Sequence, residues 1–116
     1  MKSYTDISQS KKLAEILPLE SADMFYTLID QGLYLEVKQG IEPSKDDIPC
    51  WSLSALMDVL PDEVGDNHYL TLDKEGKEYC CCYEDNNGNS FKHCFSNNSV
   101  DACVDMIENL HKQKLL

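Results

Sequence analysis

Residues 68–97, HYLTLDKEGKEYCCCYEDNNGNSFKHCFSN, decide the fold because they hold three strand-like segments separated by two turn signals. The first signal, DKEGK, is typical of a type I turn with Asp73 at its first position and Gly76 in the left-handed conformation. The second contains Asn87-Gly88, the strongest short-range signal for a β-hairpin. The stretch therefore predicts a meander of three antiparallel strands.

The register of the second hairpin predicts where its cysteines face. Neighbouring side chains in a strand point to opposite faces, so Cys80 and Cys82 share one face and Cys81 lies on the other. A two-residue turn at Asn87-Gly88 would pair Cys82 with His93, Cys81 with Cys94, and Cys80 with Phe95. The more apolar face carries Cys80, Cys82, Phe91 and Phe95, joined by Leu70 and Leu72 if the first turn has three residues. We predict that this face belongs to the core, with cysteine acting as a small hydrophobic residue.

The same register argues against a zinc site or a disulfide. A structural zinc ion needs four converging ligands, whereas Cys80, Cys82 and His93 provide three with no obvious fourth. A Cys81–Cys94 disulfide is sterically conceivable, but a reducing compartment disfavours it. We expect six free cysteines, no bound metal and no cofactor.

Three helices and a further strand region are predicted outside the meander. The first helix is capped by Thr5 or Asp6, with Gln9 at capping-box spacing, and is closed by Pro18. Residues 25–37 form one or two strands, and residues 41–49 form a loop. Ser52 caps the second helix, where Trp51 and Leu56 have the spacing of a hydrophobic staple. The third helix starts at Asn98 or Ser99 and buries the stripe Cys103, Met106, Ile107 and Leu110.

These elements predict an α+β fold in a single globular domain, residues 1–116. A mainly antiparallel sheet of four to five strands packs with about three amphipathic helices. A parallel element joining residues 25–37 to residues 67–73 through the second helix is a further possibility.

The charge of the chain excludes direct binding to nucleic acid. The sequence has 10 lysines, no arginine and 21 acidic residues, for a net charge of −11. No lysine cluster supplies the local positive charge that phosphate contacts require. No stretch approaches the roughly 18 apolar residues of a membrane span, and the start lacks the features of a secretory signal, so we expect no membrane association and a cytoplasmic location.

No catalytic group of residues can be assembled from the sequence. The histidines lie far apart, and the DNNGNS segment lacks the glycine and glutamate positions of a calcium loop. Whether the chain is an enzyme stays open, although the sequence favours a non-enzymatic role. A ligand pocket between the sheet and the Trp51 helix is an alternative, with Tyr79, Tyr83 and His93 as its lining.

Three blocks carry a resemblance to a known family: residues 9–24, 48–61 and 100–116. The amino-acid sequences of these blocks, and their order along the chain, resemble a family of small uncharacterised proteins from gut bacteria of the Bacteroides type, often found among phage or mobile-element genes. The resemblance implies a bacterial, cytoplasmic protein in a mobile-element context. The family has no assigned activity, so the resemblance transfers no functional residue.

The function that we expect is protein interaction, as a non-enzymatic accessory protein of a bacterial mobile element. Its protein partner is not identified by the sequence, and a homodimer is one form of the interaction. Residues 25–37 and the meander offer exposed strand edges that recruit another strand. The alternatives are a small-molecule-binding protein or minor enzyme, and an acidic inhibitor that mimics nucleic acid.

Overall fold

A computed structural model describes residues 2–29, 32–37 and 43–116. Its elements in chain order are α1 (Ile7–Ala14), the short 3-10 helix η1 (Leu19–Ser21), β1 (Met24–Ile29), β2 (Gly32–Val37), β3 (Ile48–Cys50), α2 (Leu53–Val59), β4 (Glu63–Val64), β5 (His68–Glu75), β6 (Glu78–Glu84), β7 (Ser90–Ser96) and α3 (Ser99–Lys112). The predicted α+β fold with three α-helices is confirmed. In the described chain, no helix is long and apolar enough to cross a membrane.

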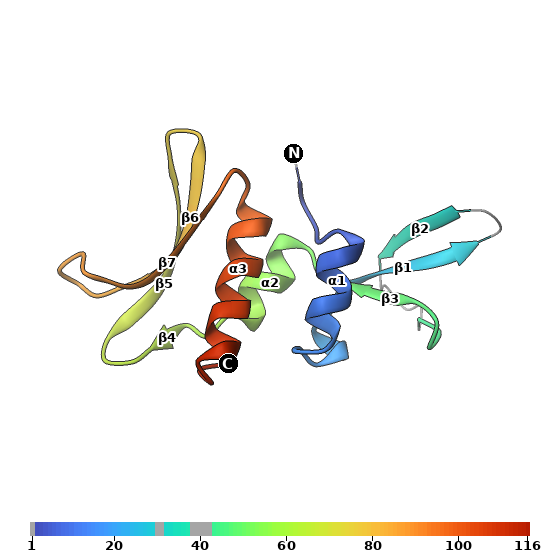
Figure 1. Cartoon of the computed structure of the whole chain (residues 1–116), viewed down its shortest axis with the longest axis horizontal. Helices are drawn as coiled ribbons and strands as arrows, with labels where there is room; N and C mark the ends of the chain where they lie inside the picture. Colours follow the sequence, from blue (N-terminus) through green and yellow to red (C-terminus); the bar gives the residue numbers. More distant parts are fainter. Residues whose placement is uncertain (1, 30–31, 38–42) are drawn as a thin grey trace.

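The strands form two antiparallel sheets rather than one. The first has the order β2-β1-β3 and the second the order β4-β5-β6-β7. Figure 1 shows the sheets at opposite ends of the molecule, with α1, α2 and α3 between them. Every strand pair in the described residues is antiparallel, so the parallel element considered from the sequence is not formed.

Local signals set the helix starts as predicted. Asp6 accepts a hydrogen bond from the Gln9 backbone N–H, and the Gln9 side chain accepts one from the Asp6 N–H, which completes the capping box of α1. Ser52 caps α2 by accepting the Ala55 N–H at 3.2 Å. Asn98 caps α3 by accepting the Asp101 N–H at 2.8 Å.

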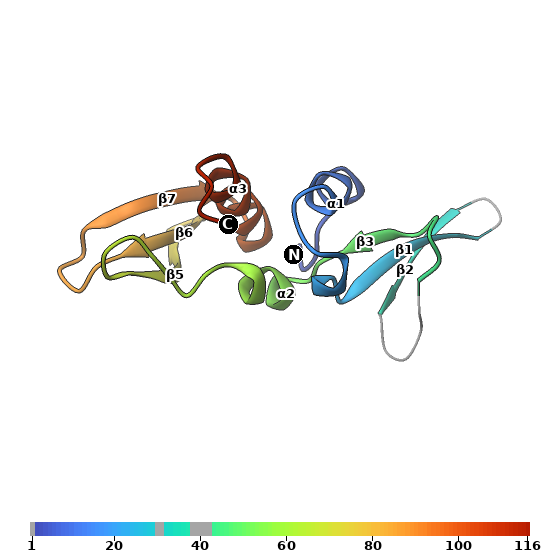
Figure 2. The ribbon, with the colours of Figure 1, turned by 90° about the horizontal axis from the view of Figure 1, so that it is seen from below.

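One buried cluster connects the helices to the four-stranded sheet. α3 packs on β6 and β7, and α2 packs on α3 (Figure 2). The cluster includes Leu13 of α1, Leu56 of α2, Tyr83 of β6 and Ile107 of α3, all with no exposed surface. Trp51, directly before the cap of α2, is equally buried, and its indole N–H donates to Ser21 Oγ at 2.9 Å.

The predicted pairing of β6 with β7 is confirmed, although the turn is longer than two residues. Cys82 lies opposite His93, Cys81 opposite Cys94 and Cys80 opposite Phe95. The turn runs from Asp85 to Asn89, and the Asp85 carboxylate accepts the N–H groups of Asn87 and Asn89 at 2.9 Å each. A bulge beside Glu84 accommodates the longer turn, so the predicted pairing of residues 80–82 with residues 93–95 is unchanged.

The prediction of which sheet face enters the core was wrong. Glu75 pairs directly with Glu78, so the first turn has two residues, and Gly76 takes φ +64° at the glycine position of a II′ hairpin. This one-residue difference places Leu72 opposite Cys81 and Leu70 opposite Tyr83. Cys81 and Tyr83 therefore face the helices, whereas Cys80 and Cys82 lie on the outer face of the sheet.

Phe91 also departs from the predicted arrangement. It falls at the bulge and has no paired residue in β6, and its ring lies against His68, with ring centroids 5.4 Å apart. Phe95 keeps its place opposite Cys80, and its ring meets that of His93 edge-on at 5.3 Å. Both phenylalanines are 46% exposed, so neither is part of the core.

Candidate functional site

The six cysteines are free and occupy three different environments. Cys81 and Cys103 meet in the core between β6 and α3, where their mutual contact, followed by burial, keeps the pKa of the Cys81 thiol well above its ordinary value. Cys94 lies at the rim of this core and accepts a hydrogen bond from Asn109 Nδ2 at 3.4 Å. Packing in the core explains the presence of these three cysteines.

Cys80 and Cys82 form part of a second group on the outer face of the four-stranded sheet. The strand alternation brings Thr71 and Asp73 of β5 beside Cys82 and Cys80 of β6, and Glu84 follows two residues after Cys82. One ligand-type atom from each of Asp73, Cys82 and Glu84 lies within 4.8 Å of the other two. We call Asp73, Cys80, Cys82 and Glu84 the outer-face cluster.

The thiol of Cys82 is the centre of this cluster. It donates to Glu84 Oε1 at 2.9 Å and lies 2.9 Å from the Thr71 hydroxyl oxygen. The side chain is only 2% exposed, although it faces away from the core. Burial, followed by the contact with Glu84, raises the pKa of Cys82 to about 12, so the thiol is protonated at neutral pH. It is therefore not an activated nucleophile in this state.

The residues suggested for a ligand pocket are not brought together. Tyr83 is fully buried, and its hydroxyl donates to the Pro61 carbonyl at 2.8 Å. Tyr79 lines a shallow surface hollow with Lys2 and Asn98, whereas His93 lies on the opposite face of the sheet beside Phe95. The sequence alternative that used these three side chains has no common cavity in the described structure.

A larger hollow lies beside the three-stranded sheet. It has a volume of about 570 Å³ and is lined mainly by apolar side chains of α1, η1, β1 and the segment before β3, among them Leu19, Met24 and Phe25. Its acidic group, Asp47, accepts the Ser44 N–H at 2.8 Å and is engaged within its own loop. The hollow thus has few polar groups free to orient a ligand.

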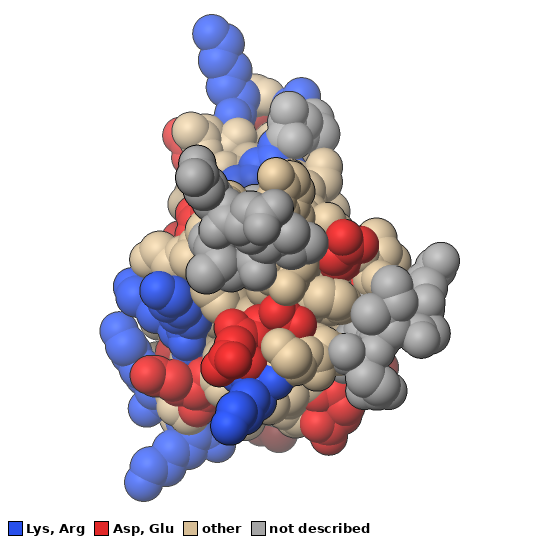
Figure 3. All heavy atoms as spheres, turned by 90° about the vertical axis from the view of Figure 1, so that its right-hand side faces the viewer, with Lys and Arg blue, Asp and Glu red and all other residues tan. Residues whose placement is uncertain are grey.

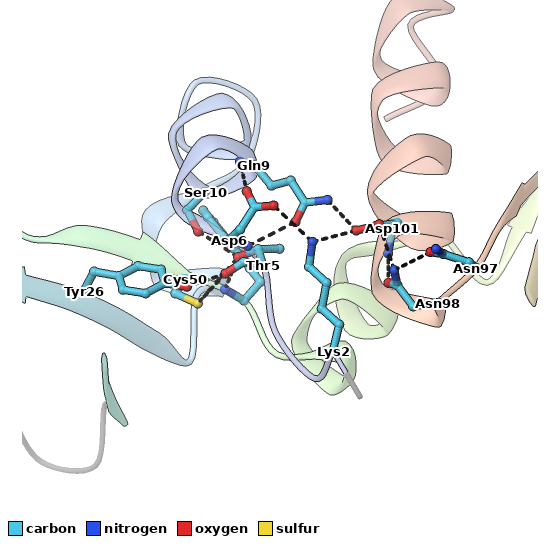
Figure 4. Close-up of polar contacts among 11 residues, drawn as sticks. Lys2, Thr5, Asp6, Gln9, Ser10, Tyr26, Cys50, Asn97, Asn98 and Asp101 are labelled. Atoms are coloured by element: carbon cyan, nitrogen blue, oxygen red, sulfur yellow. Dashed lines mark hydrogen bonds and ion pairs between the residues drawn. The ribbon is translucent and has the colours of Figure 1, made fainter. Parts of the chain in front are cut away.

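A polar network ties the N-terminal segment to both halves of the molecule (Figure 4). Thr5 is fully buried, and its hydroxyl accepts the Trp51 N–H at 3.1 Å and bonds to Ser10 Oγ at 2.8 Å. Tyr26 of β1 donates to the Thr5 carbonyl at 2.7 Å, and Cys50 lies beside the same residue. Burial raises the pKa of Cys50, so this group is structural in character.

The strand edges offer the remaining candidate surface. β2 and β3 are the edges of one sheet, and β4 and β7 are the edges of the other. β2 pairs with β1 over six residues, from Met24↔Val37 to Ile29↔Gly32, without a bulge. Tyr34 is 54% exposed and Val37 is 51% exposed. We call residues 32–37 the β2 edge.

Comparison with known proteins identifies no relative, because no protein-family model, curated protein or solved structure matches this chain. Sequence reasoning missed Asp73 and Glu84 as neighbours of Cys82. The signal for Glu84 was its position two residues after Cys82 in the same strand. The signal for Asp73 was its place opposite Cys80 once a two-residue first turn is assumed.

Proposed function

We propose that this protein is a non-enzymatic interaction protein whose β2 edge accepts an extended segment of a partner protein. The observation that carries the proposal is the regular, half-exposed edge strand at the end of the molecule. The mobile-element setting belongs to the same proposal and is supported by the sequence resemblance alone. The partner is a protein that adds a strand to the three-stranded sheet.

The β2 edge has one of the features that keep sheet edges from pairing, the charged side chain of Glu36, and lacks the others. Natural edges are protected by lysine, proline, bulges or a very short strand. Residues 32–37, GLYLEV, contain neither lysine nor proline, and the pairing with β1 is unbroken. By contrast, β4 has two residues, β3 contains Pro49, and β7 carries Lys92 beside a bulge. The β2 edge is therefore the least protected of the four.

The β1–β2 hairpin also extends away from the helices. In Figures 1 and 2 it projects beyond α1, and within the described chain the packing of β2 is with β1. Alternate backbone N–H and C=O groups along such an edge are left for a further strand. A partner segment would gain main-chain hydrogen bonds from these groups and side-chain contacts with Tyr34.

The net charge indicates the kind of partner. At −11, two copies of this chain repel each other at long range, whereas a basic partner is attracted. A partner segment carrying net positive charge is therefore the occupant that we propose, and a second copy is the competing one. The hairpin end shows acidic and lysine side chains interspersed (Figure 3), and this mixture does not favour a nucleic-acid mimic, which needs a uniformly acidic face.

The test is affinity purification of the tagged protein from its native host with two matched variants. Tyr34→Lys adds a charge at the β2 edge, which both protects an edge and repels a basic segment. Tyr69→Lys makes the same change at a tyrosine that is 42% exposed on β5 of the other sheet. We expect a protein to co-purify with the wild type and Tyr69→Lys and to be reduced at least tenfold with Tyr34→Lys.

The mass of the purified protein in solution separates the two occupants. A monomer that captures a basic protein supports the proposal. A dimer that Tyr34→Lys dissociates would show that a second copy fills the edge. A partner retained equally by all three proteins would place the interaction elsewhere and overturn the proposal.

A further inference from the structure

We propose that the outer-face cluster is a binding site for a thiophilic divalent metal ion, for which Zn²⁺ is the probe. Cys82, Asp73 and Glu84 are the first three ligands, and Cys80 supplies the fourth. The site lies on the four-stranded sheet, at the other end of the molecule from the β2 edge. It is therefore independent of the proposed interaction surface.

The separations in the cluster suit a tetrahedral ion. Zinc lies about 2.3 Å from sulfur and about 2.0–2.2 Å from carboxylate oxygen, so its ligand atoms lie about 3.5 Å apart. The ligand atoms of Asp73, Cys82 and Glu84 are within 4.8 Å of one another, and Cys82 Sγ is 2.9 Å from Glu84 Oε1. Small side-chain rotations can bring all three to one ion.

Cys80 is a candidate for the fourth ligand because it shares this face of the sheet. Its side chain is 5% exposed, yet it makes no hydrogen bond to a nitrogen or oxygen atom within the described residues. It lies on the same strand face as Cys82, directly opposite Asp73, and the Cys82 thiol is near enough to interact with it. The Cys80 sulfur lies outside the set of Asp73, Cys82 and Glu84 atoms that are within 4.8 Å of one another, so its side chain would have to rotate toward them to complete a mixed sulfur and oxygen site.

The charge of the cluster also favours a cation. In the described part of the chain, the ion pairs formed by lysine involve Lys2, and none reaches Asp73 or Glu84. The cluster therefore gathers two carboxylates beside two thiols, and no lysine ion pair within the described residues balances the carboxylates. Binding of Zn²⁺ displaces the thiol protons to solvent and leaves the thiolates on the ion.

This inference departs from the expectation drawn from the sequence, which was that no metal is bound. That expectation considered Cys80, Cys82 and His93 and found no fourth ligand. The structure adds Asp73 and Glu84 on the same face as the two cysteines. His93 lies opposite Cys82, but its ring meets that of Phe95 edge-on, and the four-residue cluster is proposed without it.

The experiment is a titration of the reduced, untagged full chain with Zn²⁺, and with Co²⁺ as a spectroscopic substitute. We expect one ion per chain, a dissociation constant below one micromolar, and a thiolate-to-cobalt charge-transfer absorption. Cys82→Ser should abolish this absorption or weaken binding at least a hundredfold. Glu84→Gln, which alters a partly exposed side chain and leaves the thiols intact, should weaken binding at least tenfold.

Two controls keep the outcome specific. Cys94→Ser removes a thiol from the opposite face of the sheet, and Glu63→Gln removes an exposed carboxylate from β4, so neither should change the affinity by more than twofold. Absence of stoichiometric Zn²⁺ binding to the wild type overturns the proposal. Equal affinity in the wild type and Glu84→Gln, or an equal loss in Cys94→Ser, also overturns it.

Discussion

At the scale of single residues, Asp101 couples charge to folding. It lies in the first turn of α3 and accepts hydrogen bonds from Lys2 Nζ at 2.8 Å and Gln9 Nε2 at 2.7 Å, which join α3 to the N-terminal segment (Figure 4). Burial opposes its ionisation, but hydrogen bonds from Lys2, Asn98 and Gln9 outweigh burial and hold the pKa of Asp101 below its ordinary value. A carboxyl of this kind stabilises the fold above the unfolded pKa of about 4, and the contribution is lost as pH falls through the folded pKa.

We therefore expect Asp101→Asn to lower the free energy of unfolding at pH 7 by about 1 kcal/mol. The variant should also lose less stability than the wild type below about pH 4. Urea denaturation at a series of pH values measures both effects. Asp105→Asn is the matched control, because burial, aided by the charges of Glu108 and Asp101, raises the pKa of Asp105. Its neutral amide should leave stability at pH 7 unchanged or slightly higher, so equal losses in the two variants would contradict this account.

At the scale of elements, the start of α2 depends on a shared carboxylate. Ser52 Oγ accepts the Ala55 N–H and donates to Asp23 Oδ2, while Asp23 Oδ1 accepts the Ser52 N–H at 2.9 Å. The cap thus fixes the helix and also joins it to the segment that precedes β1. Ser52→Ala should cost about 1–2 kcal/mol of stability, because one helix N–H and one carboxylate oxygen lose their partner.

Ser54→Ala is the control for this prediction. Ser54 is exposed within the same helix, where alanine is a good helix former, so its replacement should change stability by less than about 0.5 kcal/mol. Chemical denaturation followed by Trp51 fluorescence measures both variants. A Ser52→Ala protein as stable as Ser54→Ala would show that the cap contributes nothing.

The helices and strands also differ in how well the sequence predicts them. Helix starts were predictable because the capping residues Asp6, Ser52 and Asn98 act within three residues of their partners. The face of β5 that enters the core was not predictable, because one residue more or less in the turn at Gly76 moves every side chain of β5 to the other face of the sheet. The sequence predicts a loop over residues 41–49 because prolines disfavour a strand, yet Pro49 lies in the edge strand β3, where proline is tolerated. The division into two sheets depends on long-range pairing that has no local signal.

The candidate sites show the same contrast between features with a local signal and features that depend on pairing between strands. The strands in residues 25–37 were predictable because strand propensity is a local property. The outer-face cluster was not, because Asp73 comes beside Cys80 through pairing between strands, and its effect is not visible in sequence order. An error of one residue in register is enough to hide Asp73, whereas Glu84 shares the face of Cys82 by strand alternation alone.

At the scale of the whole molecule, the central helices hold two sheets together in an elongated shape. The radius of gyration is 15.1 Å, against about 13 Å for a compact chain of this length. The buried cluster reaches from Leu13 in α1 to Tyr83 in β6, and the Thr5 network joins the three-stranded sheet to the same core. Elongation alone would favour independent unfolding of the two ends, whereas the shared core favours a single transition.

We predict that the shared core has a larger effect on unfolding than the elongated shape, and that the chain unfolds in one cooperative step. Trp51 fluorescence reports the side of the core near η1, and far-ultraviolet circular dichroism reports all strands and helices. The two signals should give the same urea midpoint and the same free energy of unfolding. Leu56→Ala, which empties a fully buried position in α2, should lower both midpoints together, by about 2–5 kcal/mol in stability. Separate midpoints in the wild type, or a shift of one signal alone in Leu56→Ala, would mean that the sheets unfold as independent units and that the helices do not couple them.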